Sequence, residues 1–234
     1  MRPEALIFDV FGTLVDWRGS IATHVVAAFA ATGREVDGEA FADAWRAEYQ
    51  PAMERIRTRG RGYVPLDDLH RENLMAVLAA TGHTATFEPD EIVALARAWE
   101  RLDPWPDVPA GLLRLKDRAI IAACSNGSIA LMTRLARHAR LPWDCILGAD
   151  IARDYKPKPA VYTAACAALR LEPAQVMMVA AHEDDLAAAH NAGLATAYVP
   201  RPEEFGPARP ATAAPATGWD VVARDLHDLA DRLG

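Results

Sequence analysis

Residues 5–14 read ALIFDVFGTL, a short apolar run that contains Asp9 and is followed by Gly12. A continuous apolar run of this length is typical of a strand buried on both faces of a parallel sheet. We therefore expect a strand over Ala5–Val10 that ends in a loop. Because ligands of open α/β sheets bind beyond the carboxyl ends of the strands, Asp9 lies where chemistry is expected.

The second half of the chain alternates strand patterns with helical patterns. We expect strands over Ala119–Cys124, Cys145–Leu147, Val176–Ala180 and Thr196–Val199, and helices over Ile129–Ala139, Pro159–Leu169 and Asp184–Ala192. This order predicts an α/β fold, a Rossmann-like open parallel sheet with helices on both faces. After a proline-rich loop over 200–218, a last helix over Asp225–Leu233 is expected to dock on the sheet.

Between the first and second strands the pattern is helical throughout. We expect a first helix that is capped by Ser20 and ends at Gly33, and a loop rich in glycine and arginine over Thr58–Pro65. Other apolar residues recur at helical spacing, in the sets Phe41, Trp45 and Tyr49; Leu69, Leu74 and Val77; Ile92, Leu95 and Trp99. The sequence thus predicts an all-helical cap inserted after strand one, with a core domain of residues 1–16 and 101–234 and a cap domain of residues 17–100.

The composition excludes several classes of protein. The chain has 234 residues, 51% hydrophobic and 24% charged, as ordinary globular proteins have. Its formal net charge is −7 and no basic run occurs, so nucleic acid is not an expected partner. Three cysteines without metal-ligand spacing predict neither a disulfide framework nor a zinc site. We see no signal-peptide pattern and no apolar stretch near 18 residues, so we expect no membrane span and a cytoplasmic location.

Polar residues follow four of the predicted strands or precede the next helix. Asp9 and Thr13 follow the first strand, Ser125-Asn126-Gly127 the second, Lys156-Pro157 precedes a helix, and Asp185 follows a later strand. A single acid after a strand is often only a loop cap. Four such placements at one edge of a sheet indicate a site.

These segments resemble, in order, the four motifs of the haloacid dehalogenase superfamily. The matching residues are Phe8 to Leu14, Ser125 to Ser128, Tyr155-Lys156-Pro157 with Tyr162 beyond them, and the region of Asp185. The resemblance spans essentially the whole chain, including the helical cap. Within the superfamily the chain is most similar to the type II 2-haloacid dehalogenases, which act on L-2-haloacids.

Two departures bear on the reaction that this resemblance implies. Phosphatases of the superfamily carry a second Asp two residues after the nucleophile, where this chain has Phe11, and a Gly-Asp pair where it has Ala180 and Ala181. A leaving alcohol needs a proton donor, and Mg²⁺ prefers carboxylate oxygens. A leaving halide needs neither, so we expect no metal and no cofactor.

The resemblance also implies catalytic roles. Asp9 attacks the carbon that carries the halogen and forms an ester, and Lys156 supplies the neighbouring cation. Thr13 holds the Asp9 carboxylate, and Asp185 orients or deprotonates the water that opens the ester. His182, where some members have Asn, is expected to assist that water.

The expected substrate contacts are Ser125 and Asn126 for the substrate carboxylate, the cap residue Arg46 for the halide, and Phe11 and Tyr162. Each of these residues could instead have a purely structural role. Asp9 and the Ser125-Asn126 pair could be loop and helix caps, Lys156 a surface residue, and Arg46 as solvated as Arg55, Arg57 and Arg59 beside it.

Three functions remain at this stage. The first is a metal-independent dehalogenase that converts a short 2-haloacid to a 2-hydroxyacid and halide, with a homodimer suggested by the resemblance. The second is a Mg²⁺-dependent phosphatase of a small metabolite that uses Asp9, Asp185 and one of Glu183 or Asp184. The third is an inactive anion-binding protein.

Overall fold

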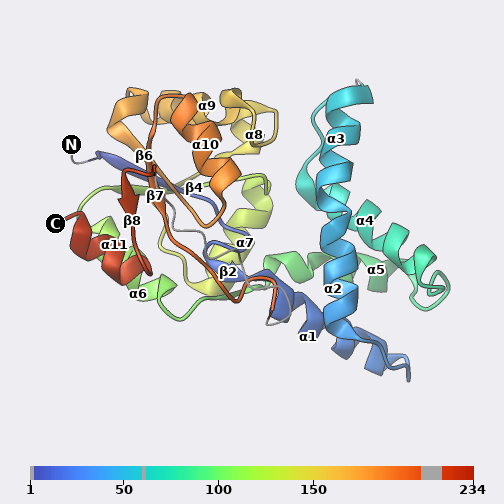
Figure 1. Cartoon of the computed structure of the whole chain (residues 1–234). Helices are drawn as coiled ribbons and strands as arrows, with labels where there is room; N and C mark the ends of the chain where they lie inside the picture. Colours follow the sequence, from blue (N-terminus) through green and yellow to red (C-terminus); the bar gives the residue numbers. More distant parts are fainter. Residues whose placement is uncertain (1–2, 60–61, 207–217) are drawn as a thin grey trace.

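The computed structural model describes residues 3–59, 62–206 and 218–234. Its centre is a six-stranded sheet in which every neighbouring pair is parallel (Figure 1). The strands lie in the order β5 (Cys145–Gly148), β4 (Ile120–Ser125), β1 (Ala5–Phe8), β6 (Val176–Ala180), β7 (Ala195–Tyr198) and β8 (Val221–Val222). Strand β1 thus lies between β4 and β6, and the chain reverses its direction of winding at β1.

Both faces of the sheet are covered. Successive side chains of β1 point to opposite faces, so Leu6 and Phe8 join one core cluster and Ala5 and Ile7 join another. On the first face pack α6 (Val108–Lys116), α7 (Ile129–Ala139) and α11 (Leu226–Arg232), and on the second α9 (Pro159–Leu169) and α10 (Glu183–Asn191). The predicted Rossmann-like α/β fold is confirmed.

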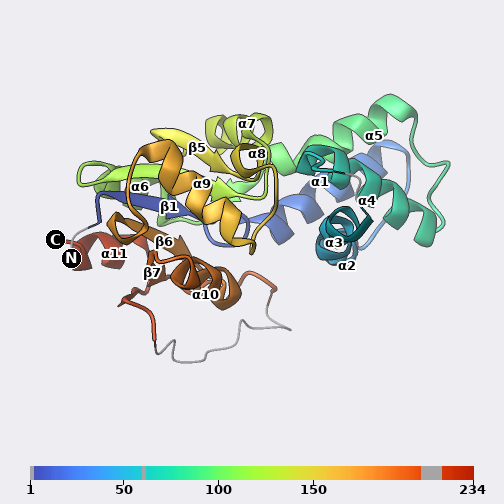
Figure 2. The same ribbon diagram turned by 90° about the horizontal axis from the view of Figure 1, so that it is seen from above.

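The insert after β1 is helical in its described part. It consists of α1 (Trp17–Ala31), α2 (Gly38–Ala47), α3 (Tyr49–Arg59), α4 (Leu66–Ala80), α5 (Pro89–Ala96) and a 3₁₀ turn over Arg97–Glu100. These helices lie away from the two chain termini, beyond one end of the sheet (Figures 1 and 2). Strand β2 (Val15–Asp16), which leads into the insert, pairs antiparallel with β3 (Asp103–Pro104), which leads out of it.

The first helix begins earlier than its sequence suggests. The side chain of Asp16 accepts the backbone N–H of Gly19 at 2.9 Å and caps α1, so the expected cap at Ser20 is wrong. Ser20 lies inside the helix, and its hydroxyl accepts the N–H of Asp103 at 2.9 Å. The Ser20 hydroxyl, which was expected to cap the helix, therefore makes a long-range contact with Asp103 instead. Gly33, with φ of 72°, follows the helix end as predicted.

Other differences concern short elements. Strand β1 ends at Phe8 rather than Val10, and the two-residue strands β2, β3 and β8 are too short to show a period. Helices α6 and α8 (Ala149–Ala152) also follow turn-rich or short segments and were not predicted. Helix α11 docks on α6 and β8. Of the expected loops, residues 60–61 and 207–217 lie outside the described part of the chain.

No helix within the described ranges combines the length and apolar character that crossing a bilayer requires.

Candidate active site

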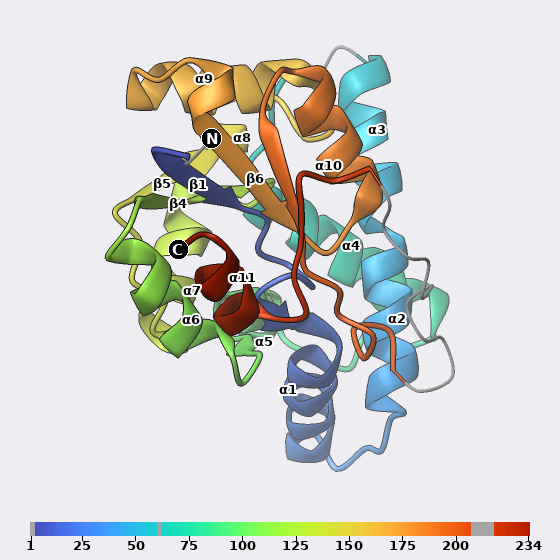
Figure 3. The ribbon, with the colours of Figure 1, turned by 60° about the vertical axis from the view of Figure 1, so that its left-hand side comes forward.

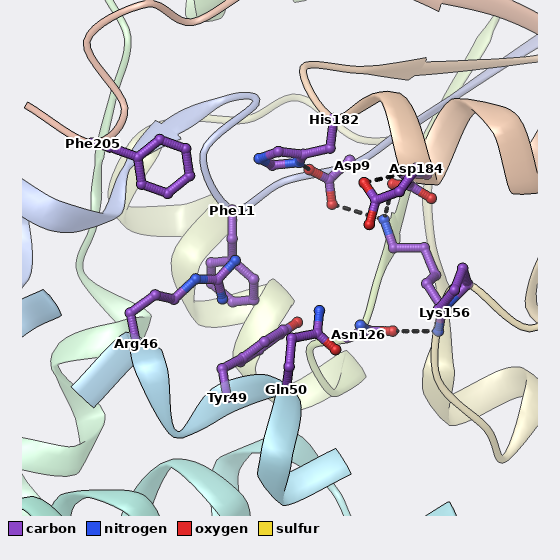
Figure 4. Close-up of a pocket in the computed structure, with 12 residues that line it drawn as sticks. Asp9, Phe11, Arg46, Tyr49, Gln50, Asn126, Lys156, His182, Asp184 and Phe205 are labelled. Carbon is purple, nitrogen blue, oxygen red and sulfur yellow. Dashed lines mark hydrogen bonds and ion pairs between the residues drawn. The ribbon is translucent and has the colours of Figure 1, made fainter. Parts of the chain in front are cut away.

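Three of the predicted site segments meet because their strands are neighbours. Strands β4, β1 and β6 lie side by side and parallel, so the residues after them collect at one edge of the sheet, facing the insert. There they surround a cavity of about 220 Å³ (Figure 4). The lining residues are Asp9, Phe11, Arg46, Tyr49, Gln50, Asn126, Lys156, Pro157, His182, Asp184, Asp185 and Phe205.

Asp9 is the most heavily hydrogen-bonded carboxylate at this edge. It is 6% exposed, and Lys156 Nζ lies 2.7 Å from its Oδ1. Its Oδ2 accepts the Thr13 hydroxyl at 2.7 Å and faces His182 Nδ1 at 3.1 Å. Burial by itself raises the pKa of Asp9, but the Lys156 ammonium and the His182 ring outweigh it and hold that pKa far below its usual value. Asp9 is therefore an ionised, poorly solvated carboxylate.

Thr13 is oriented by a second hydrogen bond. Its Oγ1 accepts the backbone N–H of Ala181 at 3.0 Å, which leaves the hydroxyl proton to Asp9. Gly12, with φ of 84°, turns the chain between Asp9 and Thr13 in a conformation that side chains rarely adopt. The local sequence therefore directs the hydroxyl back toward the carboxylate.

Lys156 bridges two carboxylates. Its Nζ lies 2.5 Å from Asp185 Oδ2 in addition to its contact with Asp9. Burial lowers the pKa of Lys156, but Asp185 and Asp9 outweigh it and hold that pKa well above its usual value, so the ammonium persists. Burial raises the pKa of Asp185, which Lys156 opposes and Asp9 reinforces. The two carboxyl groups thus have pKa values pushed in opposite directions.

Two expected substrate contacts have hydrogen-bond partners within the protein. Tyr162 is fully buried on α9, and its hydroxyl donates to Asp185 Oδ1 at 2.5 Å. Ser125 is also fully buried, and its Oγ accepts the N–H of Gly127 at 3.0 Å within its own loop. Asn126 does reach the cavity, with its Oδ1 accepting the backbone N–H of Lys156 at 2.7 Å.

The opposite wall comes from the helical insert and is aromatic. The Arg46 guanidinium lies 4.0 Å from the ring centre of Tyr49 and 5.4 Å from that of Trp17. Its Nη1 is buried and has no hydrogen-bond partner among the described residues. Phe11 lies beside Arg46 in the cavity (Figure 4), and its ring is edge-on to that of Trp99, with 5.6 Å between the ring centres. A guanidinium held by rings, with an unpaired N–H group, is suited to an incoming anion.

Four lining or adjoining residues were not assigned to the site beforehand. Tyr49 and Gln50 follow Arg46 by three and four residues, the spacing that places helical residues on one face, so this signal was present. For Asp184 the sequence suggested only the role of a metal ligand in the phosphatase alternative. Glu204 lies in the proline-rich segment after β7, where no periodicity or motif marks it.

The comparisons with known proteins identify the class. Residues 3–193 match the family model of haloacid dehalogenase-like hydrolases. The chain belongs to this family, as the resemblance of its four motifs predicts.

Three relatives with which the chain can be compared over most of its length are 2-haloacid dehalogenases. The (S)-2-haloacid dehalogenase of Xanthobacter autotrophicus is 32% identical over 204 residues, which cover 85% of this chain and 75% of the relative. A solved structure of a defluorinating L-2-haloacid dehalogenase is 48% identical, with a TM-score of 0.96 over 99% of this chain and 95% of that one. The Xanthobacter autotrophicus L-2-haloacid dehalogenase with chloropropionic acid covalently bound is 26% identical, with a TM-score of 0.81 over 98% and 97% of the two chains.

Proposed function

We propose that this protein hydrolyses short 2-haloacids to 2-hydroxyacids and halide, with Asp9 as the nucleophile. The observation that carries the proposal is that the ionised Asp9 carboxylate lines a cavity of about 220 Å³ together with Arg46, whose Nη1 has no partner among the described residues. A carboxylate nucleophile on one wall and an anion site on the other suit the displacement of a halide. The identities of 48% and 32% with L-2-haloacid dehalogenases support the same substrate class.

The first half of the reaction forms an ester. An oxygen of Asp9 attacks the carbon that carries the halogen, and the carbon–halogen bond breaks as the halide leaves with its electron pair. Lys156 and His182 stabilise the Asp9 anion without protonating it. In this proposal Asn126, which lines the cavity, contacts the substrate carboxylate, and Arg46, which lines it too, contacts the departing halide.

The second half regenerates Asp9. Water attacks the Asp9 carbonyl carbon, and the bond from that carbon to the Asp9 oxygen that carries the substrate breaks, so that this oxygen leaves with the product and the water oxygen stays on Asp9, whose carboxyl group then releases its proton. Asp185 accepts a proton from the water, and Lys156, 2.5 Å away, passes one to the departing alkoxide. Asp185 then returns its proton to Lys156. In total, the haloacid and water give the hydroxyacid, halide and one proton.

A magnesium-dependent phosphatase does not fit these residues. The Lys156 ammonium occupies the space between Asp9 and Asp185, at 2.7 and 2.5 Å. No group of three or more His, Cys, Asp or Glu side chains in the described part of the chain is arranged to hold a metal ion. Phe11 lies where a phosphatase needs its second acid. The proposed reaction therefore contains no step at a metal ion.

The test is halide release from chloroacetate, fluoroacetate and L-2-chloropropionate in excess EDTA, beside p-nitrophenyl phosphate with and without Mg²⁺. We expect halide release that EDTA leaves unchanged and that Asp9→Asn abolishes, with Asp90→Asn, an exposed acid of the insert, as the matched control. Metal-dependent phosphate release without halide would contradict the proposal. Ligand binding without any turnover would indicate the inactive binding protein.

We also propose that residues 17–100, which supply Arg46, Tyr49 and Gln50, form a separate cap domain. The expected homodimer stays a prediction that light scattering can measure.

A further inference from the structure

A buried carboxylate outside the four motifs lies directly behind His182. Glu204 is 2% exposed, and its oxygens lie 2.9 and 3.1 Å from His182 Nε2. Trp17 Nε1 donates to the same carboxylate at 3.0 Å. On its other side the His182 ring faces Asp9 Oδ2 at 3.1 Å. One ring therefore connects Glu204 to the nucleophile.

The segment that carries Glu204 is anchored to the core. Arg201 donates from Nε to the Thr13 carbonyl oxygen at 2.8 Å, and its guanidinium pairs with Asp107 at 2.7 Å. At Gly12 a Cβ would lie 2.1 Å from Glu204 Oε1, so only glycine leaves room for this carboxylate. After β7 this segment passes beside the start of α1 (Figure 3), and there Glu204 meets Trp17.

This arrangement determines the protonation of His182. An ionised carboxylate only accepts hydrogen bonds, so a ring between two of them donates from both nitrogens and is an imidazolium. Burial lowers the pKa of His182, but the hydrogen bonds to Asp9 and Glu204 outweigh it and raise that pKa to about 10. The other charged groups that line the same cavity are Lys156, Arg46, Asp184 and Asp185.

We propose that Glu204 is a positioning residue: it holds His182 with both nitrogens protonated and aims its Nδ1–H at Asp9 Oδ2, to serve the hydrolysis of the ester. This inference rests on the proposed dehalogenase function. It also assigns the two oxygens of Asp9, since Oδ2 has two donors, Thr13 and His182, whereas Oδ1 has the Lys156 ammonium.

In this assignment Oδ1 attacks the substrate, and Oδ2 becomes the carbonyl oxygen of the ester. When water adds to the carbonyl carbon, negative charge develops on Oδ2, where the imidazolium and the Thr13 hydroxyl donate. The bond from that carbon to Oδ1 then breaks, and Lys156, beside Oδ1, protonates the departing oxygen. Donors placed in advance at a developing oxyanion are a large contribution to such reactions.

The test compares Glu204→Gln with Glu203→Gln, an exposed neighbour in the same segment. An amide cannot balance an imidazolium, so the ring becomes neutral, and even a ring that keeps its Nδ1–H toward Asp9 then donates without a positive charge. Single-turnover experiments measure ester formation by the halide burst and ester decay by intact-protein mass. We expect Glu204→Gln to slow ester decay roughly ten- to hundredfold, with little change in formation, because complete removal of one oxyanion donor costs about 10²–10³ and this variant only weakens the donor. Glu203→Gln should behave as the parent.

A spectroscopic measurement separates positioning from general damage. The ¹⁵N signals of the His182 ring in the parent should report an imidazolium that titrates near pH 10, and in Glu204→Gln the titration should move toward 6.5. Should Glu204→Gln fail to fold, the parent titration and the ester decay of His182→Asn still test the inference. Equal loss of ester formation and decay, or an unmoved titration, would overturn it. A parent that releases no halide but shows the raised titration would contradict the proposed function alone.

Discussion

Arg46 differs from the other arginines of the insert in its surroundings. Arg55 is exposed and faces Glu48 at 3.8 Å, and Arg57 donates to the backbone oxygen of Lys156 at 2.8 Å. Arg57 also has a buried Nε without a partner among the described residues, but of these three arginines Arg46 is the one that lines the cavity, where it lies over Tyr49 with a buried Nη1 that likewise has no partner there. Its place in the cavity, rather than its residue type, is the reason to propose Arg46 as the halide contact.

The first prediction concerns Arg46→Lys. A lysine keeps the charge but loses the planar group that stacks on Tyr49 and its second donor. We expect kcat/KM for L-2-chloropropionate to fall roughly ten- to hundredfold, equivalent to about 1.4–2.8 kcal/mol, and inhibition by added chloride or bromide to weaken. Arg55→Lys is the matched control. Equal kinetics in the two variants would mean that Arg46 does not bind the halide.

At the scale of elements, helix α6 depends on a close approach to α11. Gly111 lies in the buried face of α6, and a Cβ there would come within 2.4 Å of the Leu226 Cβ. Helix propensity alone favours alanine over glycine by about 1 kcal/mol. The packing contact therefore opposes the local preference of the helix.

We expect Gly111→Ala to lower the free energy of unfolding by about 1 kcal/mol or more, because overpacking typically costs about 1–3 kcal/mol. Urea denaturation measures this change. The control is Ala110→Gly, at an exposed position of the same helix, which changes propensity without touching α11. If Gly111→Ala were more stable than the parent, propensity would outweigh packing at this contact.

At the scale of the whole molecule, the site links stability to pH from both sides. The pKa of Asp9 is lowered in the folded state, so its contribution is present above pH 3.8 and is lost as the pH falls. The pKa of His182 is raised from 6.5 to about 10, so its contribution is complete below pH 6.5 and is lost as the pH rises toward 10. Asp9 and His182 thus stabilise the fold most in between, whereas Asp185, whose pKa burial raises, acts in the opposite sense.

The alkaline side gives the last prediction. Between pH 6.5 and 10, the free energy of unfolding of the parent should fall relative to that of His182→Asn by up to about 1.4 kcal/mol per pH unit. This is the slope expected when the folded state binds one more proton than the unfolded state. Urea denaturation at several pH values measures both proteins. Parallel pH profiles over this range would show that His182 keeps its ordinary pKa in the folded state.

The sequence predicts much of the site because its motifs are local. Asp9 and Thr13 are four residues apart in one turn, and the segments at Asn126 and Asp185 each follow an apolar strand that periodicity reveals. Parallel pairing of neighbouring strands then brings these segments together. The hydrogen bond from Tyr162 to Asp185 and the one from Gly127 to Ser125 within its own loop could not be predicted, since neither follows from the spacing of residues in the sequence.

By itself, the sequence determined the α/β fold, the helical insert after the first strand and the group of Asp9, Thr13, Lys156 and Asp185. These depend on apolar periodicity and on short motifs, which act over a few residues. Only the tertiary structure decided the use of Ser20 and the partnership of Glu204 with His182. Each depends on contacts between segments far apart in the chain, such as Glu204 with Trp17 at a separation of 187 residues, and such contacts form only when the packed core brings the segments together.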